Sequence, residues 1–316
     1  MIPISVVTGF LGAGKSTLLR RILRDPAWAD SAVIVNEFGE IPLDHDLIAA
    51  SEESFVSAST GCLCCVVRDD LTQTLLDLLR RREAGAVPRY ARVLIETSGL
   101  ADPAPILHAL MTDEALGATH ALRSTVTLVD ALHGAATLAR HPEAQRQVML
   151  ADRILVTKPD LAAPPLAAIH ALNPAAPWRG AAHGAADPDW LFAAAPRAAE
   201  LPAWAARHTA GLASIVIERE APIAALALTL WLQGLAEHAG ARLLRLKGLV
   251  ALAEQPDRPA VLHAIQHMVH PLEWLDTWPG ADRRSRIVLI GERIPRHFPA
   301  RLLAAIEAEL ADAIGR

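Results

Sequence analysis

Aromatic residues are scarce in this sequence: they make up 4% of its 316 residues, with one tyrosine and five phenylalanines. The hydrophobic fraction is nevertheless 52%, so there is enough apolar material for a large core. That core must be mostly aliphatic, because alanine and leucine supply the greater part of it. The length allows one large domain or two of ordinary size.

Long apolar runs are also missing. Stretches such as residues 2–7 are far shorter than the ~18 residues needed to span a bilayer. No positively charged segment precedes this first apolar run, and the run leads directly into a glycine loop. We therefore do not expect it to be a signal peptide. A net charge of -5 provides no broad basic field for nucleic acid. We therefore expect a cytoplasmic protein that acts neither on membranes nor on nucleic acid.

Only three cysteines are present, and Cys62, Cys64 and Cys65 fall within four residues. An odd, crowded set makes a poor disulfide framework. In a reducing compartment, clustered thiols more often serve metal or redox chemistry. The alternative is that they are small buried hydrophobic residues.

Short apolar runs alternate with helical patterns over the first half of the chain. The runs predict strands at residues 4–8, 32–36, 92–96, 125–129 and 153–157. The helical patterns lie at residues 15–23, 71–82, 143–150 and 166–172. Continuous β-branched and leucine runs are typical of strands covered on both faces. This alternation predicts an α/β fold, namely a P-loop NTPase domain with a mainly parallel sheet and right-handed crossovers.

Three segments follow from this reading: a nucleotide-binding domain at residues 1–179, a connecting segment at 180–211, and a smaller α+β domain at 212–316. The connecting segment is rich in alanine, proline, tryptophan and glycine and has no clear periodicity. The last segment predicts strands at 214–218, 243–252, 261–267 and 287–291 and helices at 224–238 and 299–314.

A glycine-rich loop follows the first predicted strand and precedes the first helix. Its sequence, Gly9-Phe-Leu-Gly-Ala-Gly-Lys-Ser-Thr17, fits G-x-x-x-x-G-K-[ST] in the required context. Glycines allow the tight turn that points backbone N–H groups at phosphate oxygens, and the helix adds its positive N-terminus. Lys15 should reach the β- and γ-phosphates, Ser16 should ligate Mg²⁺, and Thr17 should lie near the α-phosphate. The predicted nucleotide-binding residues here are Gly9, Gly12, Ala13, Gly14, Lys15, Ser16 and Thr17.

The second sequence element of the predicted site is acidic and stands at the end of the strand predicted at residues 92–96. A carboxylate at the carboxyl end of a central strand faces the nucleotide crevice, so Glu96 is expected to hold Mg²⁺ through water or to orient the attacking water. Gly99 can bring its N–H close to the γ-phosphate and sense whether that phosphate is present. Lys15, Glu96 and Gly99 are therefore the predicted catalytic residues. The alternative for Glu96 is a helix cap.

A third element, Thr157-Lys-Pro-Asp160, occupies the place of the Asn-Lys-x-Asp turn of GTPases. Asp160 would accept from guanine N1–H and the 2-amino group, and the stem of Lys158 would lie over the base. Thr157 replaces the asparagine, which weakens the discrimination. Hydrogen bonds to a charged acceptor contribute roughly 1.5–3 kcal/mol, more than neutral ones, so GTP is favoured over ATP, the second candidate.

Carboxylates follow the second predicted strand. We expect Glu37 to help hold Mg²⁺ when GTP is bound, and ordering of its loop would reposition the cysteines; solvated surface carboxylates are the alternative. In an extended segment Cys62 and Cys64 share a face while Cys65 points away, so binding by three thiolates requires a turn. Otherwise two cysteines bind with one of three further residues, Glu40, His45 or Asp46. Thiolates suit Zn²⁺ and other borderline ions.

Four motifs in this order closely resemble the CobW-type GTP-binding metallochaperones, relatives of the nickel-insertion GTPases of urease and hydrogenase maturation. The motifs are the phosphate loop, Asn36-Glu-Phe-Gly-Glu40, Gly61-Cys-Leu-Cys-Cys65 and Glu96-Thr-Ser-Gly-Leu-Ala-Asp-Pro103. Residues 245–248 and 261–267 resemble the family's C-terminal domain, so the likeness covers most of the chain.

The resemblance implies a GTPase whose Cys62, Cys64 and Cys65 bind Zn²⁺ or Co²⁺ according to the nucleotide and pass the metal to a client enzyme. The sequence shows no arginine finger or catalytic glutamine, so we expect slow intrinsic turnover, accelerated by a client or by a nucleotide-dependent homodimer. Two other classes stay open, a P-loop kinase for a small molecule and a metal-sensing or buffering protein. Transfer of labelled γ-phosphate to water rather than to a metabolite would exclude the kinase.

Overall fold

The computed structural model describes residues 1–35, 55–57, 67–194, 208–209, 212–266, 268–269 and 272–314. The chain forms two compact units. The first comprises Met1–Ala168 and Ala176–Pro196, and the second comprises Ile169–Ala175 and Arg197–Arg316. Within the described ranges, no helix is both long enough and apolar enough to cross a membrane.

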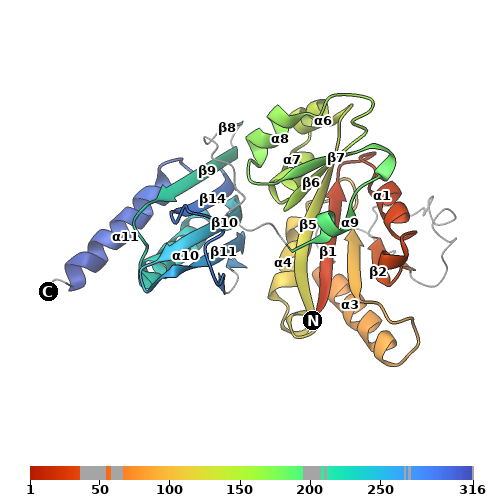
Figure 1. The fold of residues 1–316 in the computed structure, drawn as a ribbon, viewed down its shortest axis with the longest axis horizontal. Coiled ribbons are helices and arrows are strands. Elements are labelled where there is room, and N and C mark those ends of the chain that lie inside the picture. The colour runs from red at the N-terminus through yellow and green to blue at the C-terminus, as the bar shows by residue number, and fades with distance from the viewer. Residues whose placement is uncertain are drawn as a thin grey trace. The chain divides into compact units, whose positions relative to one another are not determined.

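A seven-stranded sheet organises the first unit, in the order β3-β2-β4-β1-β5-β6-β7, with every neighbouring pair parallel (Figure 1). The strands are β1 (Ile2–Gly9), β2 (Ser31–Val35), β3 (Phe55–Ser57), β4 (Arg92–Glu96), β5 (His120–Asp130), β6 (Arg153–Thr157) and β7 (Trp178–Ala181). This confirms the predicted α/β fold. Because the pairs are parallel, the carboxyl ends of these strands meet at one edge, where ligands bind in open α/β sheets.

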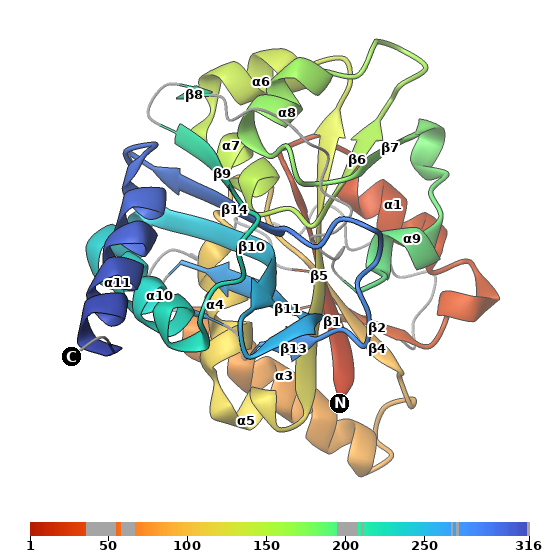
Figure 2. The same cartoon turned by 60° about the vertical axis from the view of Figure 1, so that its left-hand side comes forward.

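Helices cover both faces of this sheet (Figures 1 and 2). They are α1 (Lys15–Ile22), α3 (Val67–Glu83), α4 (Ala104–Thr112), α5 (Glu114–Gly117), α6 (Gly134–Arg140), α7 (Pro142–Met149), α8 (Leu166–Leu172) and α9 (Pro188–Phe192). Helices α1 and α9 share a buried cluster with Val126 and Leu128. Thr127 lies between these two residues and points the opposite way, and its hydroxyl donates to Gln147 O of α7 at 2.7 Å. Helix α7 therefore lies on the opposite face.

The first unit contains elements that the sequence did not predict. Strand β7 has two exposed positions and a glycine, as an edge strand can, and so lacks the apolar run used to predict the others. Beyond it, α9 begins at Pro188, and the side chain of Asp187 accepts from the first-turn amides of that helix. The first unit thus extends to Pro196, past the boundary expected at residue 179.

The second unit is an antiparallel sheet in the order β12-β11-β10-β14-β9-β8, with β13 also paired to β11. Its strands are β8 (His208–Thr209), β9 (Leu212–Arg219), β10 (Leu243–Leu252), β11 (Gln255–Ile265), β12 (Met268–Val269), β13 (Glu273–Trp274) and β14 (Ser285–Glu292). Helices α10 (Ala225–Ala239) and α11 (Phe298–Ile314) pack against it. The predicted smaller α+β domain is therefore present, and β10 has its predicted bounds.

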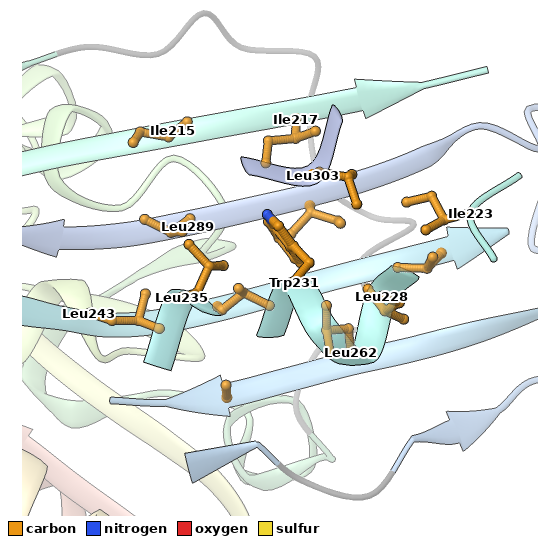
Figure 3. Packing of buried hydrophobic residues seen from close by; sticks show 14 of the residues in the cluster. Ile215, Ile217, Ile223, Leu228, Trp231, Leu235, Leu243, Leu262, Leu289 and Leu303 are labelled. Carbon is orange, nitrogen blue, oxygen red and sulfur yellow. The ribbon is translucent and has the colours of Figure 1, made fainter. Parts of the chain in front are cut away.

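Trp231 of α10 is the largest side chain in the core of the second unit (Figure 3). Its indole is fully buried among strand residues such as Ile217 and Leu289, and Leu303 of α11 packs in the same cluster. The indole N–H donates to Pro299 O at 2.8 Å, which joins the two helices and satisfies the buried polar atom.

Truncation of this anchor should destabilise the second unit strongly. Trp231→Ala removes a large buried side chain and its hydrogen bond, so we expect a loss of about 3–5 kcal/mol in the free energy of unfolding. Urea unfolding followed by far-UV circular dichroism measures the change. The matched control is Leu230→Ala at an exposed neighbouring position, expected to change stability by less than about 0.5 kcal/mol. Equal losses in the two variants would contradict this account of the core.

Candidate nucleotide site

The glycine loop joins the end of β1 to the start of α1 at the carboxyl edge of the first sheet. Gly9, Gly12 and Gly14 have φ values of 143°, 72° and 95°, a backbone conformation that residues other than glycine rarely adopt. A Cβ at Gly9 would also lie 2.5 Å from Leu128 O of β5. The loop therefore needs glycine at its first position for both backbone conformation and space.

Three side chains hold this loop by its carbonyl groups. Lys15 Nζ donates to Gly9 O at 2.8 Å, Thr157 Oγ1 donates to Ala13 O at 2.9 Å, and Lys158 Nζ donates to Gly12 O at 3.1 Å. The C=O and N–H of a trans peptide point in opposite directions, so a carbonyl fixed on one side directs the following N–H to the other. Such a loop presents backbone donors to an anion.

Ser16 and Glu96 meet directly beside the loop. The Ser16 hydroxyl donates to Glu96 Oε1 at 2.7 Å, and only 4% of the Glu96 surface is exposed. Register places Glu96 opposite Val7 of β1 on one side and Val35 of β2 on the other. The next residue, Thr97, donates through its hydroxyl to Thr8 Oγ1 at 2.7 Å. Glu96 is therefore held between two neighbouring strands. Its carboxylate accepts from Ser16 in this geometry, and the hydrogen bond is not that of a helix cap.

The turn after β4 lies against the glycine loop. A Cβ added to Gly99 would stand 2.7 Å from Leu11 N, so the two backbones are in close contact. The following Asp102 forms an ion pair with Arg146 of α7 at 2.6 Å, and its other oxygen accepts from Ala104 N at 2.9 Å. This turn is thus held both by the glycine loop and by α7.

The Thr157–Asp160 turn follows β6, and Lys158 within it has a positive φ of 56°. Its ammonium forms an ion pair with Asp130 at the end of β5. Burial raises the pKa of Asp130, but the hydrogen bond and charge of Lys158 and the amides of Leu132 and His133 outweigh it, so this pKa is lowered. Asp160 is partly exposed, with its Oδ2 3.9 Å from His183 Nε2.

The structure brings together most of the predicted site. The glycine loop, Lys15, Ser16, Glu96, Gly99, Lys158 and Asp160 all lie at one edge of the sheet, with Thr17 exposed in the first turn of α1. The predicted metal residues Cys62, Cys64, Cys65 and Glu37 lie outside the described residues, as do the alternatives Glu40, His45 and Asp46. Within the described part of the chain, no group of three or more His, Cys, Asp or Glu side chains is arranged to hold a metal ion.

Sequence reasoning missed three residues of this site. Asp130 directly follows the strand predicted at residues 125–129, so the rule that carboxyl ends share one edge could have found it. His183 follows β7, which had no periodic signal of its own. Gln147 lies inside a predicted helix, and nothing in the sequence marks it.

A loop of this geometry on a parallel sheet, with an acidic strand end beside it, defines a P-loop nucleotide-binding protein. More narrowly, the chain belongs to the CobW/HypB/UreG family. Residues 3–177 match that family's nucleotide-binding domain, and residues 212–312 match the C-terminal domain of the cobalamin synthesis protein cobW. The resemblance carried by the motifs is thereby confirmed.

Individual relatives agree with this assignment. The chain is 32% identical over 310 residues to the zinc chaperone YjiA of Escherichia coli strain K12, covering 93% of this chain and 95% of that protein. A stretch of 152 residues is 41% identical to the zinc chaperone CobW of Pseudomonas aeruginosa, covering 45% of this chain and 39% of that protein. The crystal structure of the Zn(II)-bound YjiA GTPase from E. coli superposes with a TM-score of 0.77 at 28% identity, over 96% of this chain and 98% of that one.

The Thr157 hydroxyl can be tested as a support of the loop. Thr157→Val keeps the shape but leaves Ala13 O without this donor, so we expect a loss of about 1–2 kcal/mol in the free energy of unfolding and weaker nucleotide binding. Thermal unfolding and titration with a fluorescent nucleotide measure the two effects. Thr125→Val is the matched control, because the buried Thr125 hydroxyl has no hydrogen-bond partner among the described residues. If Thr157→Val changed neither the free energy of unfolding nor the nucleotide affinity, the hydroxyl would not support the loop.

Proposed function

We propose that the protein is a GTP-hydrolysing metallochaperone of the cytoplasm, which binds a divalent transition metal and delivers it to a client protein. Zinc is the first candidate for the metal and cobalt the second. The observation that carries the proposal is the convergence of Lys15, Ser16, Glu96 and Asp160 at one edge of the sheet. The names of two relatives, both zinc chaperones, support the choice of metal.

The phosphate chemistry follows from the loop. With GTP bound, Lys15 would exchange its loop carbonyls for β- and γ-phosphate oxygens, and Gly99 N–H would meet the γ-phosphate. The adjacent Ser16 hydroxyl and Glu96 carboxylate are oxygen donors of the kind Mg²⁺ takes, so these residues would hold it. Bound Mg²⁺ supplies charge neutralisation at the phosphates. Glu96 can also orient the attacking water, and turnover is slow until a client or a second copy of the chain completes the site.

Glu37 is the further Mg²⁺ ligand we propose, and the strand register supports it. Val35, the last residue of β2, pairs with Glu96. Neighbouring strands lie ≈ 4.8 Å apart, and each residue extends the chain by at most ~3.6 Å. Glu37 comes only two residues after Val35 in the sequence, so chain length alone permits its carboxylate to share an ion with Ser16.

Guanine would be read by Asp160, and exchanging the carboxylate for an amide tests this. Asp160→Asn loses an acceptor for guanine N1–H and the 2-amino group, which should weaken GTP binding about 10- to 100-fold. Xanthine carries a carbonyl in place of the 2-amino group, so the same variant should gain affinity for XTP. Competition titrations with GTP, XTP and ATP measure the order of preference, with the exposed Asp189→Asn on α9 as control. An unchanged order in Asp160→Asn would exclude Asp160 as the base-reading residue.

We expect metal binding to depend on nucleotide, because in the sequence the cysteine motif follows β3, a strand of the sheet that carries the glycine loop. Titration of Zn²⁺ in the presence of a non-hydrolysable GTP analogue, and then of GDP, should give affinities that differ at least about 5-fold, the lower range of allosteric coupling. A triple variant, Cys62→Ser with Cys64→Ser and Cys65→Ser, should lose the Zn²⁺ site.

The control for this titration is Lys15→Ala, which should bind Zn²⁺ with one affinity whichever nucleotide is added. If wild-type protein binds Zn²⁺ equally in both nucleotide states, the coupling is refuted. If the triple serine variant retains full Zn²⁺ affinity, the assignment of the cysteines is refuted instead.

A further inference from the structure

Helix α7 holds the turn after β4 through two adjacent side chains. Gln147 Nε2 donates to Gly99 O at 3.1 Å and to Ala101 O at 3.0 Å, which uses both of its amide hydrogens. Arg146 adds the ion pair with Asp102 at 2.6 Å. The turn proposed to meet the γ-phosphate is therefore fixed along its length from one helix.

Gln147 is in an unusual position for a polar side chain, because only 1% of its surface is exposed. Its Oε1 has no hydrogen-bond partner in the part of the chain that the structure describes. The residue lines a cavity of about 120 Å³ that is also lined by the glycine loop from Phe10 to Ala13. Burying an amide is costly unless it is hydrogen-bonded, and the two donated bonds offset that cost.

The same helix also contacts the glycine loop. His141, which precedes the first residue of α7, has its ring centroid 4.5 Å from that of Phe10. The Thr127 hydroxyl donates a hydrogen bond to Gln147 O at 2.7 Å and so fixes the helix to β5. Helix α7 thus joins three parts of the site: the glycine loop, the central sheet and the turn.

We propose that Gln147 is a positioning residue that presets the Gly99–Ala101 turn for a γ-phosphate, so that it raises the affinity for GTP relative to GDP. Holding the carbonyls of Gly99 and Ala101 fixes the Gly99–Leu100 and Ala101–Asp102 peptides, and with them the backbone of the turn that carries the Gly99 N–H. Without Gln147 the turn would have to be ordered when GTP binds, at a cost in conformational entropy that GDP binding does not incur. This inference rests on the proposed function of the site.

The test compares two glutamines of the same helix. Gln147→Leu removes both donated bonds and no accepted one, and it should weaken binding of a non-hydrolysable GTP analogue about 10-fold while leaving the GDP affinity within about 2-fold. Gln145→Leu is the matched control, since Gln145 Nε2 donates to Leu138 O at 2.7 Å and does not reach the turn. Calorimetric titration of both nucleotides into each protein, with its unfolding temperature, gives the result.

A purely structural role would move both affinities together, so an unchanged ratio of GTP-analogue to GDP affinity in Gln147→Leu overturns the inference while leaving the proposed function standing. Wild-type protein that binds no guanine nucleotide overturns the proposed function and this inference with it. If Gln147→Leu does not fold, Gln147→Met, unbranched and of the same length, repeats the measurement with the same two outcomes.

Discussion

The glycine loop must leave its N–H groups available for phosphate, so the protein holds it by its carbonyls. The three donors come from two places: Lys15 at the start of α1, and the adjacent residues Thr157 and Lys158 at the end of β6. They can do so only because the parallel register brings the carboxyl ends of β1 and β6 to one edge, on either side of β5. The fold is thus a requirement for the loop conformation as well as a support for it.

This constraint also accounts for the threonine at position 157. A residue whose hydroxyl is committed to Ala13 O supports the phosphate loop and has no amide to offer a base. Lys158 is likewise engaged with Gly12 O and Asp130, so its ammonium joins the turn after β6 to the glycine loop and to the end of β5. In the proposed function, discrimination between bases would rest largely on Asp160, in keeping with the weaker preference for guanine expected from the sequence.

The sequence predicted those parts of the fold and site in which local pattern and tertiary role coincide. Strands β4 and β6 have their predicted bounds because both are apolar runs buried on both faces, and the glycine loop was found because its conformation demands glycine. Strand β7 was missed because an edge strand needs no apolar run.

Asp130, His183 and Gln147 were missed for a different reason. Each acts on a residue distant in sequence: Asp130 on Lys158, His183 on Asp160, and Gln147 on Gly99. Its place after a predicted strand puts Asp130 at the carboxyl edge, but its pairing with Lys158, like the other two contacts, depends on which strand ends and helices the fold brings together. Gln147 is the extreme case, since a buried glutamine in a helix looks like any solvent-facing one in sequence.

The sheet also shows how a phosphate could influence the cysteine motif. Glu96 of β4 pairs with Val35 of β2, which pairs in turn with Ser57 of β3, so three neighbouring strand ends form one row. The cysteines lie in residues 58–66, between the end of β3 and the start of α3 at Val67, while Glu37 follows the end of β2. The strand ends that precede these two segments, Val35 and Ser57, therefore lie within two strand spacings, about 10 Å, of Glu96. A tenfold change in metal affinity requires only about 1.4 kcal/mol, the contribution of one or two hydrogen bonds. One ligand interaction at Glu37, gained with GTP and lost with GDP as proposed, would thus be large enough to account for the coupling.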